Sequence, residues 1–224
     1  MKGETALQTY KDLLREGFNT YTREAFYALP RLERPRILDV GCGSGVPTME
    51  LARLCRGEIV ALDIDQSLLD RLARKAEEAG VSERVSTTRC SMLDMDFPEE
   101  SFDIIWAEGS IQHIGFQRGL TEWRRFLKPH GFLVVHDETG DVSEKLEHIA
   151  SCGYELRRHF TVSSDAWWAE FYAPLEKRIS EMRAAGIDDP RALEEADSDQ
   201  RFIDTFKEDP SRYGSVFFIM EKRG

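Results

Sequence analysis

The stretch that decides the fold covers residues 37–45, which read Ile37-Leu38-Asp39-Val40-Gly41-Cys42-Gly43-Ser44-Gly45. An apolar run that contains an acid leads into a turn with the spacing G-x-G-x-G. Glycine adopts backbone conformations closed to other residues and lets the main chain approach a ligand closely. The free N–H groups at the start of a following helix favour the same kind of site. The stretch therefore predicts a buried strand that ends in a ligand-binding turn.

The composition fits one globular α/β domain over residues 1–224. Of the 224 residues, 41% are hydrophobic and 32% are charged, which is ordinary for a chain that buries a complete core. The formal net charge is -11. Because that charge repels phosphate backbones, we expect no nucleic-acid partner.

The cysteine pattern indicates a reducing compartment. No C-x-x-C spacing or clustered framework links the four cysteines, which are Cys42, Cys55, Cys90 and Cys152. We expect no leader peptide before them. No apolar run approaches the roughly 18 residues that span a bilayer. We therefore expect a cytoplasmic protein that does not bind membranes.

Hydrophobic periodicity predicts alternating strands and helices in the first two thirds of the chain. Residues 4–29 read as helix with a break near Gly17. Strands are predicted at residues 37–40, 58–62, 84–90, 102–107 and 132–136. Helices are predicted between them, at residues 46–54, 67–79 and 116–127. This alternation indicates a parallel, doubly wound sheet.

The last third of the chain breaks the alternation. It predicts a helix at residues 141–151, a strand at 154–162, helices at 165–185 and 190–207, and a final strand at 216–220. The two strands are thus separated by a long helical passage.

The glycine turn resembles the first motif of class I S-adenosylmethionine (SAM) methyltransferases. A dinucleotide-binding turn would carry glycine or alanine at the position of Val46, which disfavours a nicotinamide enzyme. The methyltransferase motif instead places an acid two residues before the first glycine, as Asp39 does here. The resemblance implies that Asp39 anchors the turn and the methionine end of SAM. It also implies that the turn binds the cofactor, through Gly41, Cys42, Gly43 and Gly45.

The resemblance implies a seven-stranded, mostly parallel sheet whose last strand is antiparallel. It places an N-terminal helical lid at residues 1–30 and a helical cap, inserted before the last strand, at residues 163–208. Both segments carry aromatic residues that could line an acceptor pocket or simply pack as core, Trp167, Trp168 and Tyr172 among them.

Asp63 ends the second predicted strand, about 20 residues after the glycine turn, where a carboxylate can accept hydrogen bonds from both ribose hydroxyls. The resemblance assigns Asp63 to the ribose and Ile64 to one face of the adenine. The alternative for Asp63 is a helix N-cap, although Asp65 is better placed for that role.

The segment after the third predicted strand resembles the family's adenine-binding motif. The family has an acid or small polar residue against the adenine amino group, and Ser91 occupies that position, followed by Met92. Either Ser91 or the nearby Asp94 could hold the amino group. Core packing is the alternative for Met92.

The fourth predicted strand ends near the expected reacting centre. Ligands of open α/β sheets bind at the carboxyl ends of the strands, which places Glu108 beside the sulfonium methyl, as an acceptor-orienting group, a base or a ligand of the SAM amine. His113 is the only histidine in the following loop. It is a candidate base, with a surface or helix-capping histidine as the alternative.

The turn before the fifth predicted strand, Leu127-Lys128-Pro129-His130-Gly131, resembles a family turn with glycine in place of His130. Separately, the loop at residues 108–116 (E-G-x-I-x-x-I-G-F), the Trp-Trp helix and the final strand make the chain similar to a poorly characterised microbial subgroup of these methyltransferases. That subgroup brings no settled acceptor.

These residues predict an enzyme that transfers a methyl group from SAM to a small-molecule acceptor by in-line displacement. We expect a monomer or homodimer, and the sequence calls for no metal. Three alternatives stay open: a catalytically silent SAM-binding sensor or assembly module, a protein or tRNA methyltransferase, and a nicotinamide dehydrogenase.

Overall fold

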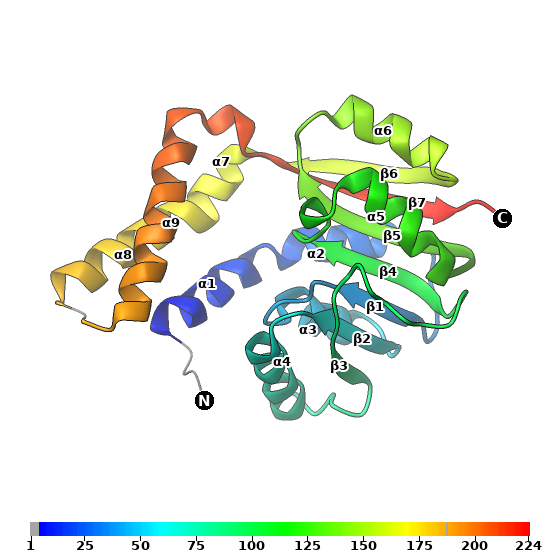
Figure 1. The fold of residues 1–224 in the computed structure, drawn as a ribbon, viewed down its shortest axis with the longest axis horizontal. Helices are drawn as coiled ribbons and strands as arrows, with labels where there is room; N and C mark the ends of the chain where they lie inside the picture. Colours follow the sequence, from blue (N-terminus) through cyan, green and yellow to red (C-terminus); the bar gives the residue numbers. More distant parts are fainter. Residues whose placement is uncertain (1–4, 187) are drawn as a thin grey trace.

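A seven-stranded sheet in the order β3-β2-β1-β4-β5-β7-β6 forms the centre of the molecule (Figure 1). The computed structural model describes residues 5–186 and 188–224, so the predicted helix start at residue 4 lies outside the described residues. The strands are β1 (Arg36–Val40), β2 (Glu58–Asp63), β3 (Val85–Arg89), β4 (Phe102–Glu108), β5 (Leu127–Glu138), β6 (Tyr154–Val162) and β7 (Ser215–Lys222). Strands β1 to β5 pair in parallel, whereas β7 runs antiparallel between β5 and β6. The predicted doubly wound sheet with an antiparallel last strand is confirmed.

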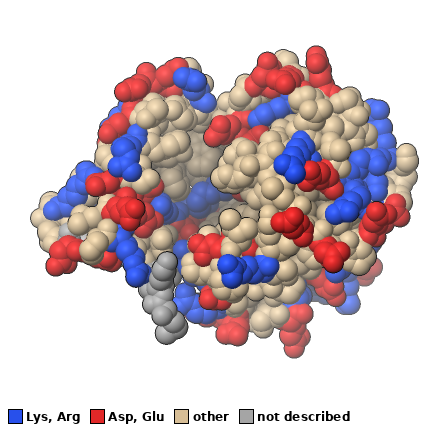
Figure 2. Space-filling model, viewed as in Figure 1, with Lys and Arg blue, Asp and Glu red and all other residues tan. Residues whose placement is uncertain are grey.

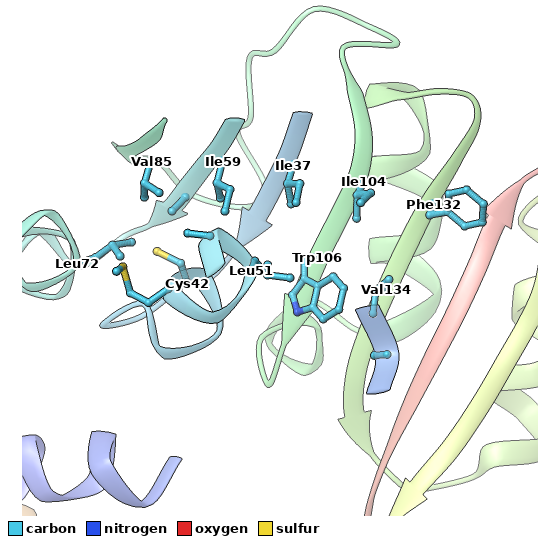
Figure 3. Packing of buried hydrophobic residues seen from close by; sticks show 14 of the residues in the cluster. Ile37, Cys42, Leu51, Ile59, Leu72, Val85, Ile104, Trp106, Phe132 and Val134 are labelled. Carbon is cyan, nitrogen blue, oxygen red and sulfur yellow. The ribbon is translucent and has the colours of Figure 1, made fainter. Parts of the chain in front are cut away.

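Helices cover both faces of the sheet. One face packs against α2 (Asn19–Tyr27), α3 (Val46–Leu54) and α4 (Gln66–Glu78). The other packs against α5 (Phe116–Trp123) and α6 (Val142–Ser151). Alternate residues along each strand pack in one core or the other, because successive side chains point to opposite faces of the sheet. Figure 3 shows the first core, in which Trp106 of β4 lies beside Val134 of β5.

A third apolar cluster lies beyond the sheet. It joins α1 (Ala6–Gly17) to α8 (Ala173–Ala184) and α9 (Pro190–Glu208), and Figure 1 shows these helices standing apart from the strands. Leu7 of α1 and Ile179 of α8 are completely buried there. We call α7 (Ser164–Trp167), the turn η3 (Trp168–Tyr172), α8 and α9 the cap helices. Short 3-10 turns complete the fold: η1 (Ile111–His113), η2 (Arg124–Phe126) and η4 (Pro210–Arg212).

Three predicted elements differ in extent. The helix expected at residues 116–127 ends at Trp123, because the 3-10 turn η2 follows it and Leu127 already begins β5. The helix expected at residues 165–185 is interrupted by η3, a π-helical turn. Pro174, in the first turn of α8, has no N–H to give to the carbonyl four residues earlier, which explains the wider spacing before it. The strand expected at residues 132–136 is longer, because Leu127 already pairs with Phe102 before a register shift.

The segment 127–131, expected as a turn before the strand, forms the first part of β5. His130 has a positive φ of 59°. Glycine suits such a conformation better than a residue with a Cβ, in keeping with the glycine that the family turn carries there.

Candidate functional site

The glycine turn after β1 has the geometry of a ligand cradle. Gly41, Gly43 and Gly45 have φ values of 71°, 55° and 81°. A Cβ at Gly41 would lie 2.5 Å from Ser110 Cβ, and one at Gly45 would lie 2.3 Å from Leu72 Cδ1. A Cβ at Gly43 would meet no atom within 4 Å. Two glycines are therefore required by packing, whereas the middle one leaves open space for a ligand.

Asp63 connects the end of β2 to that turn. Its carboxylate accepts hydrogen bonds from the backbone N–H groups of Gly43 and Asp65, both at 2.9 Å. The N-cap of α4 is Asp65, which accepts from the Ser67 N–H at 2.8 Å, so the N-cap alternative for Asp63 is wrong. The neighbouring Ile64 side chain is 67% exposed. An acid and an exposed apolar side chain thus lie side by side next to the turn.

Asp39 is buried beneath the turn, where it accepts a hydrogen bond from Thr48 Oγ1 at 2.6 Å. Burial raises the pKa of its carboxyl to about 7, and the negative charges of Glu108 and Asp63 act in the same direction. Burial also raises the pKa of the Cys42 thiol. Three carboxyl groups at one edge of the sheet favour a cationic ligand.

The segment after β3 supplies small and apolar groups. The Ser91 hydroxyl accepts from the Leu93 N–H at 3.2 Å. Met92 packs on the second core, and its Cε lies 3.5 Å from where a Gly41 Cβ would be. Met92 is therefore a core residue that also reaches the glycine turn, and its contact with adenine stays a prediction. Leu93 and Asp94 are exposed.

Glu108, at the end of β4, is fully engaged with the N-terminal helices. Its Oε1 accepts from Thr22 Oγ1 at 2.9 Å and from Trp106 Nε1 at 2.8 Å. Its Oε2 accepts from Arg15 Nη2 at 3.2 Å. Burial raises the pKa of this carboxyl, and the Arg15 guanidinium opposes that shift. Glu108 thus joins α1 and α2 to the sheet.

Helix α1 also contacts the glycine turn. Asp12 accepts hydrogen bonds from the Ser44 hydroxyl, from Arg71 and from Lys75, each at 2.7 Å. One carboxylate therefore connects α1 to the turn and to α4. The other side of α1 faces the cap, where Lys11 forms ion pairs with Glu195 and Asp199 of α9.

A cavity of about 280 Å³ lies between the sheet edge and the cap helices. Figure 2 shows this face of the molecule hollowed between the two parts. Glu108, Gly109, Gln112, Asp137, Glu138 and Gly214 line it, together with the basic residues Arg15 and His136, the hydroxyl of Ser215 and four aromatic side chains, Trp167, Tyr172, Phe202 and Tyr213. The cavity therefore begins at the end of β4, where the sequence placed the reacting centre.

His136 of β5 is the histidine of this cavity, and sequence reasoning assigned it no role. Its ring is buried, and Nε2 lies 2.7 Å from Ser215 Oγ, which in turn accepts a hydrogen bond from Trp167 Nε1 at 2.8 Å. Burial holds the pKa of this imidazole well below its usual range, and the positive charge of Arg15 lowers it further. The ring is thus neutral. Glu108 and His136 are direct neighbours in the β4–β5 pairing.

His113, the histidine chosen from sequence, is exposed in η1 and does not line the cavity, although its neighbour Gln112 does. The signal that could have found His136 is its position at the carboxyl end of β5. The signal for Arg15 is weaker, because it lies on a helix whose distance from the sheet edge no local pattern reveals.

Comparison with known proteins identifies what the chain is similar to. Residues 37–131 match the family model described as a methyltransferase domain. The matched region runs from β1 to the start of β5 and therefore includes the glycine turn, Asp63 and Glu108.

The chain is similar to part of a curated sterol methyltransferase. The chain is 28% identical over 180 residues to the sterol 24-C-methyltransferase ERG6B of Gibberella zeae, a match that covers 67% of this chain and 47% of the relative. The chain thus spans about half the length of this curated relative.

Solved structures share the fold of this chain over nearly its whole length. The [4+2]-cyclase SpnF aligns with a TM-score of 0.76 at 22% identity, covering 92% of this chain and 81% of that one. A SAM-dependent methyltransferase from Geobacter sulfurreducens in complex with S-adenosyl-L-homocysteine aligns with a TM-score of 0.74 at 20% identity, covering 91% of both chains.

Within the described residues the structure has neither a membrane-spanning helix nor a cluster of metal ligands. No helix in residues 5–186 and 188–224 is long and apolar enough to cross a membrane. Within the same ranges, no group of three or more His, Cys, Asp or Glu side chains has the arrangement of a metal site.

Proposed function

We propose that this protein transfers the methyl group of SAM to a small-molecule acceptor held in the cavity between the sheet edge and the cap. The observation that carries the proposal is the glycine turn, with open space at Gly43 and the Asp63 carboxylate 2.9 Å from its N–H. The matching family model, which begins in β1, supports it.

The residues around the turn fit the chemistry of SAM. Asp63 would accept hydrogen bonds from the ribose hydroxyls, exchanging part of its backbone contacts for them. Ile64 and Met92 offer apolar surfaces for adenine, and Ser91 or Asp94 would face its amino group. Asp39 supplies negative charge beneath the turn, which Gly41, Cys42, Gly43 and Gly45 form. This arrangement suits a ligand with a sulfonium and an ammonium group.

SAM supplies an activated methyl group and a neutral thioether leaving group. The protein therefore has to orient the acceptor in line with the breaking bond and to exclude water. In our proposal the N-terminal lid (residues 1–30) and the cap (residues 163–208) do this as parts of one domain. Residues 1–4 and 187 of these segments lie outside the described residues.

Glu108 and His113 remain candidate catalytic residues, but only Glu108 lines the cavity. Glu108 lines the cavity, but both of its oxygens are already bonded, which suits an orienting role better than that of a base. His113 would act only if an acceptor extended toward η1.

Calorimetry with SAM, S-adenosylhomocysteine and NADH tests the donor. We expect SAM and S-adenosylhomocysteine to bind and NADH to give no heat of binding. Binding of NADH without SAM would overturn the proposal in favour of a dehydrogenase.

The second candidate function is that of a protein that binds SAM but does not transfer its methyl group. It is favoured by the structural similarity to SpnF, a [4+2]-cyclase. Mass spectrometry of acceptors incubated with isotopically labelled SAM distinguishes the two. Labelled product supports methyl transfer, whereas tight SAM binding with no labelled product from a broad acceptor panel supports a silent module or another reaction.

We infer that the protein works in the cytoplasm as a monomer or homodimer and binds neither nucleic acid nor membranes. Its four cysteines are free, which suits a reducing compartment. Its net charge of -11 disfavours nucleic acid.

A further inference from the structure

A groove lies at the amino edge of the sheet, at the other end of β1 from the glycine turn. The segment 29–34, which leads into β1, forms one wall, and the end of α3 (residues 52–56) forms another. Ile104 of β4, which Figure 3 labels in the first core, lines it as well. The volume is about 1140 Å³. None of the residues that line this groove belongs to the glycine turn or to the cavity below the cap.

The charge of the groove is opposite to that of the whole chain. Its charged lining residues are five arginines and one glutamate, namely Arg31, Arg34, Arg53, Arg56, Arg84 and Glu33. The chain as a whole has 41 acidic and 30 basic residues. The arginines come from three separate segments, so no charge run marks them in the sequence. The fold therefore builds a positive site on a negative protein, and such a site attracts anions.

Three of these arginines have no partner in the part of the chain that the structure describes. The side chains of Arg31, Arg34 and Arg56 are exposed there and form no ion pair or hydrogen bond. The other two are engaged, since Arg53 pairs with an acid of its own helix at 3.2 Å and Arg84 donates to carbonyls at the end of α3. Because acids outnumber bases in this chain, a shortage of carboxylates does not explain the unpaired arginines. Their charge is thus available to a ligand.

The groove also exposes apolar surface. Phe26, Leu29, Leu32 and Val81 pack on the first core but are only partly buried, and the Tyr27 side chain is 71% exposed. Among the described residues that line the groove there is no lysine, aspartate or serine. Interfaces between proteins are enriched in arginine and aromatic residues and depleted in those three. The composition therefore indicates a protein partner.

Size and surroundings distinguish a peptide from other anions. The volume exceeds the roughly 300–1,000 Å³ of small-molecule sites. A nucleic acid would extend past the groove and be repelled by the excess of acid that the chain carries elsewhere. A bilayer binds protruding apolar side chains, whereas the apolar residues here line a recess.

We propose that this groove is a docking site for an acidic, amphipathic segment of a partner protein. Carboxylates of the segment meet Arg31, Arg34 and Arg56, since a guanidinium can hold a carboxylate by two parallel hydrogen bonds. Its apolar side chains cover the partly buried residues of the groove and pack against the Tyr27 ring. Because the glycine turn lies at the other end of β1, the partner holds the protein without blocking that turn.

The probe is a short fluorescent peptide in which glutamate and leucine alternate, with binding measured by fluorescence anisotropy. A glutamate–serine peptide keeps the charge and loses the apolar side chains. A lysine–leucine peptide keeps the apolar side chains and reverses the charge. We expect the glutamate–leucine peptide to bind at least about 10-fold more tightly than either. No binding of this peptide, or a smaller preference for it, would overturn the proposal.

Two variants place the binding in the groove. Arg31→Glu combined with Arg56→Glu reverses the charge on two walls and removes no hydrogen bond or ion pair of the described chain, so the thermal unfolding midpoint should stay that of wild type. We expect affinity for the glutamate–leucine peptide to fall by at least about 10-fold. Tyr27→Ala, which changes no charge, should weaken binding several-fold.

The matched control is Arg201→Glu combined with Arg223→Glu, which changes the net charge equally at two exposed arginines outside the groove. Its affinity for the peptide should stay within about 2-fold of wild type. Wild-type affinity in either groove variant, or an equal loss in the control, would place the binding elsewhere and contradict the proposal.

Competition separates the peptide from other anions. Oligothymidine, laurate and phosphatidylglycerol vesicles are each added at the same concentration of negative charge as the unlabelled peptide. We expect only the unlabelled peptide to displace the probe. Displacement by one of the other three would assign the groove to nucleic acid, a small amphiphile or a membrane and overturn the proposal. A protein that binds the peptide but not SAM would overturn the proposed function alone.

Discussion

The glycine turn and the aromatic-walled cavity differ in how far apart their partners lie in the sequence. At the turn, Gly43 and Asp63 are 20 residues apart. At the cavity, Arg15 and Glu108 are 93 residues apart, and His136 and Ser215 are 79 apart. The residues of the glycine turn therefore belong to one strand–turn–helix–strand unit, and a sequence motif can identify them. The cavity is assembled only by the complete fold, so it can vary between relatives that keep the same turn.

The largest expected effect is on stability, at Glu108, which lies between the glycine turn and the cavity. Glu108→Ala would leave the partly buried Arg15 without its ion pair and would remove the hydrogen bonds to Thr22 and Trp106. We expect the free energy of unfolding to fall by about 3 kcal/mol, measured by urea denaturation. The exposed Glu99 is the control, and Glu99→Ala should stay within about 0.5 kcal/mol of wild type. Similar values for the two variants would mean that Glu108 does not hold the N-terminal helices.

The next effect concerns the turn alone. Asp63→Ala should weaken SAM binding by about 2 kcal/mol, because hydrogen bonds from the ribose to a charged group are lost. Titration calorimetry measures the change, with Asp96→Ala in an exposed loop as the matched control. Wild-type affinity in a folded Asp63→Ala protein would move the ribose contact to another residue.

A smaller effect is expected on the protonation of Asp39, which should change when SAM binds. The folded pKa of Asp39, about 7, lies above the usual value of about 4, so this residue makes folding less favourable as pH rises between those two values. A cationic ligand favours its ionised form. SAM binding at about pH 6 should therefore release up to one proton, detected as a dependence of the binding heat on the buffer's ionisation enthalpy.

Asp39→Asn provides the comparison for that measurement, because an amide can still accept from Thr48 but cannot titrate. The variant should lose most of the proton release and should show a flatter dependence of stability on pH between about 4 and 7. Proton release that persists in Asp39→Asn would assign it to another group.

The smallest effect is expected at the cap. Lys11→Ala removes half-buried ion pairs to Glu195 and Asp199 and should lower the unfolding free energy by about 0.5 kcal/mol. Limited proteolysis should nevertheless cut the cap helices faster than in wild type. Lys177→Ala, whose side chain is 80% exposed, is the control. Equal cleavage rates in the two variants would show that α1 does not restrain the cap.

The same contrast explains which parts of the structure were predictable. The seven-stranded doubly wound sheet, the antiparallel β7 and the Asp65 cap follow from local patterns and from the family resemblance, and the structure confirms them. The π-helical turn before Pro174 needs knowledge of what the helix packs against. The engagement of Glu108 and the burial of His136 depend on the placement of α1 and the cap, which periodicity does not encode.

The position of α1 between the sheet and the cap has a consequence for how the protein is made. Helix α1 is synthesised well before the cap helices, yet Thr5 donates a hydrogen bond to Glu195, which is translated 190 residues later. Its apolar face has no complete partner until α8 and α9 have been synthesised. Domains tend to fold during synthesis from the N-terminus onward, but here α1 must wait for α8 and α9. A chain stalled before the cap would thus expose Leu7 and its neighbours, which makes it a natural target for chaperones.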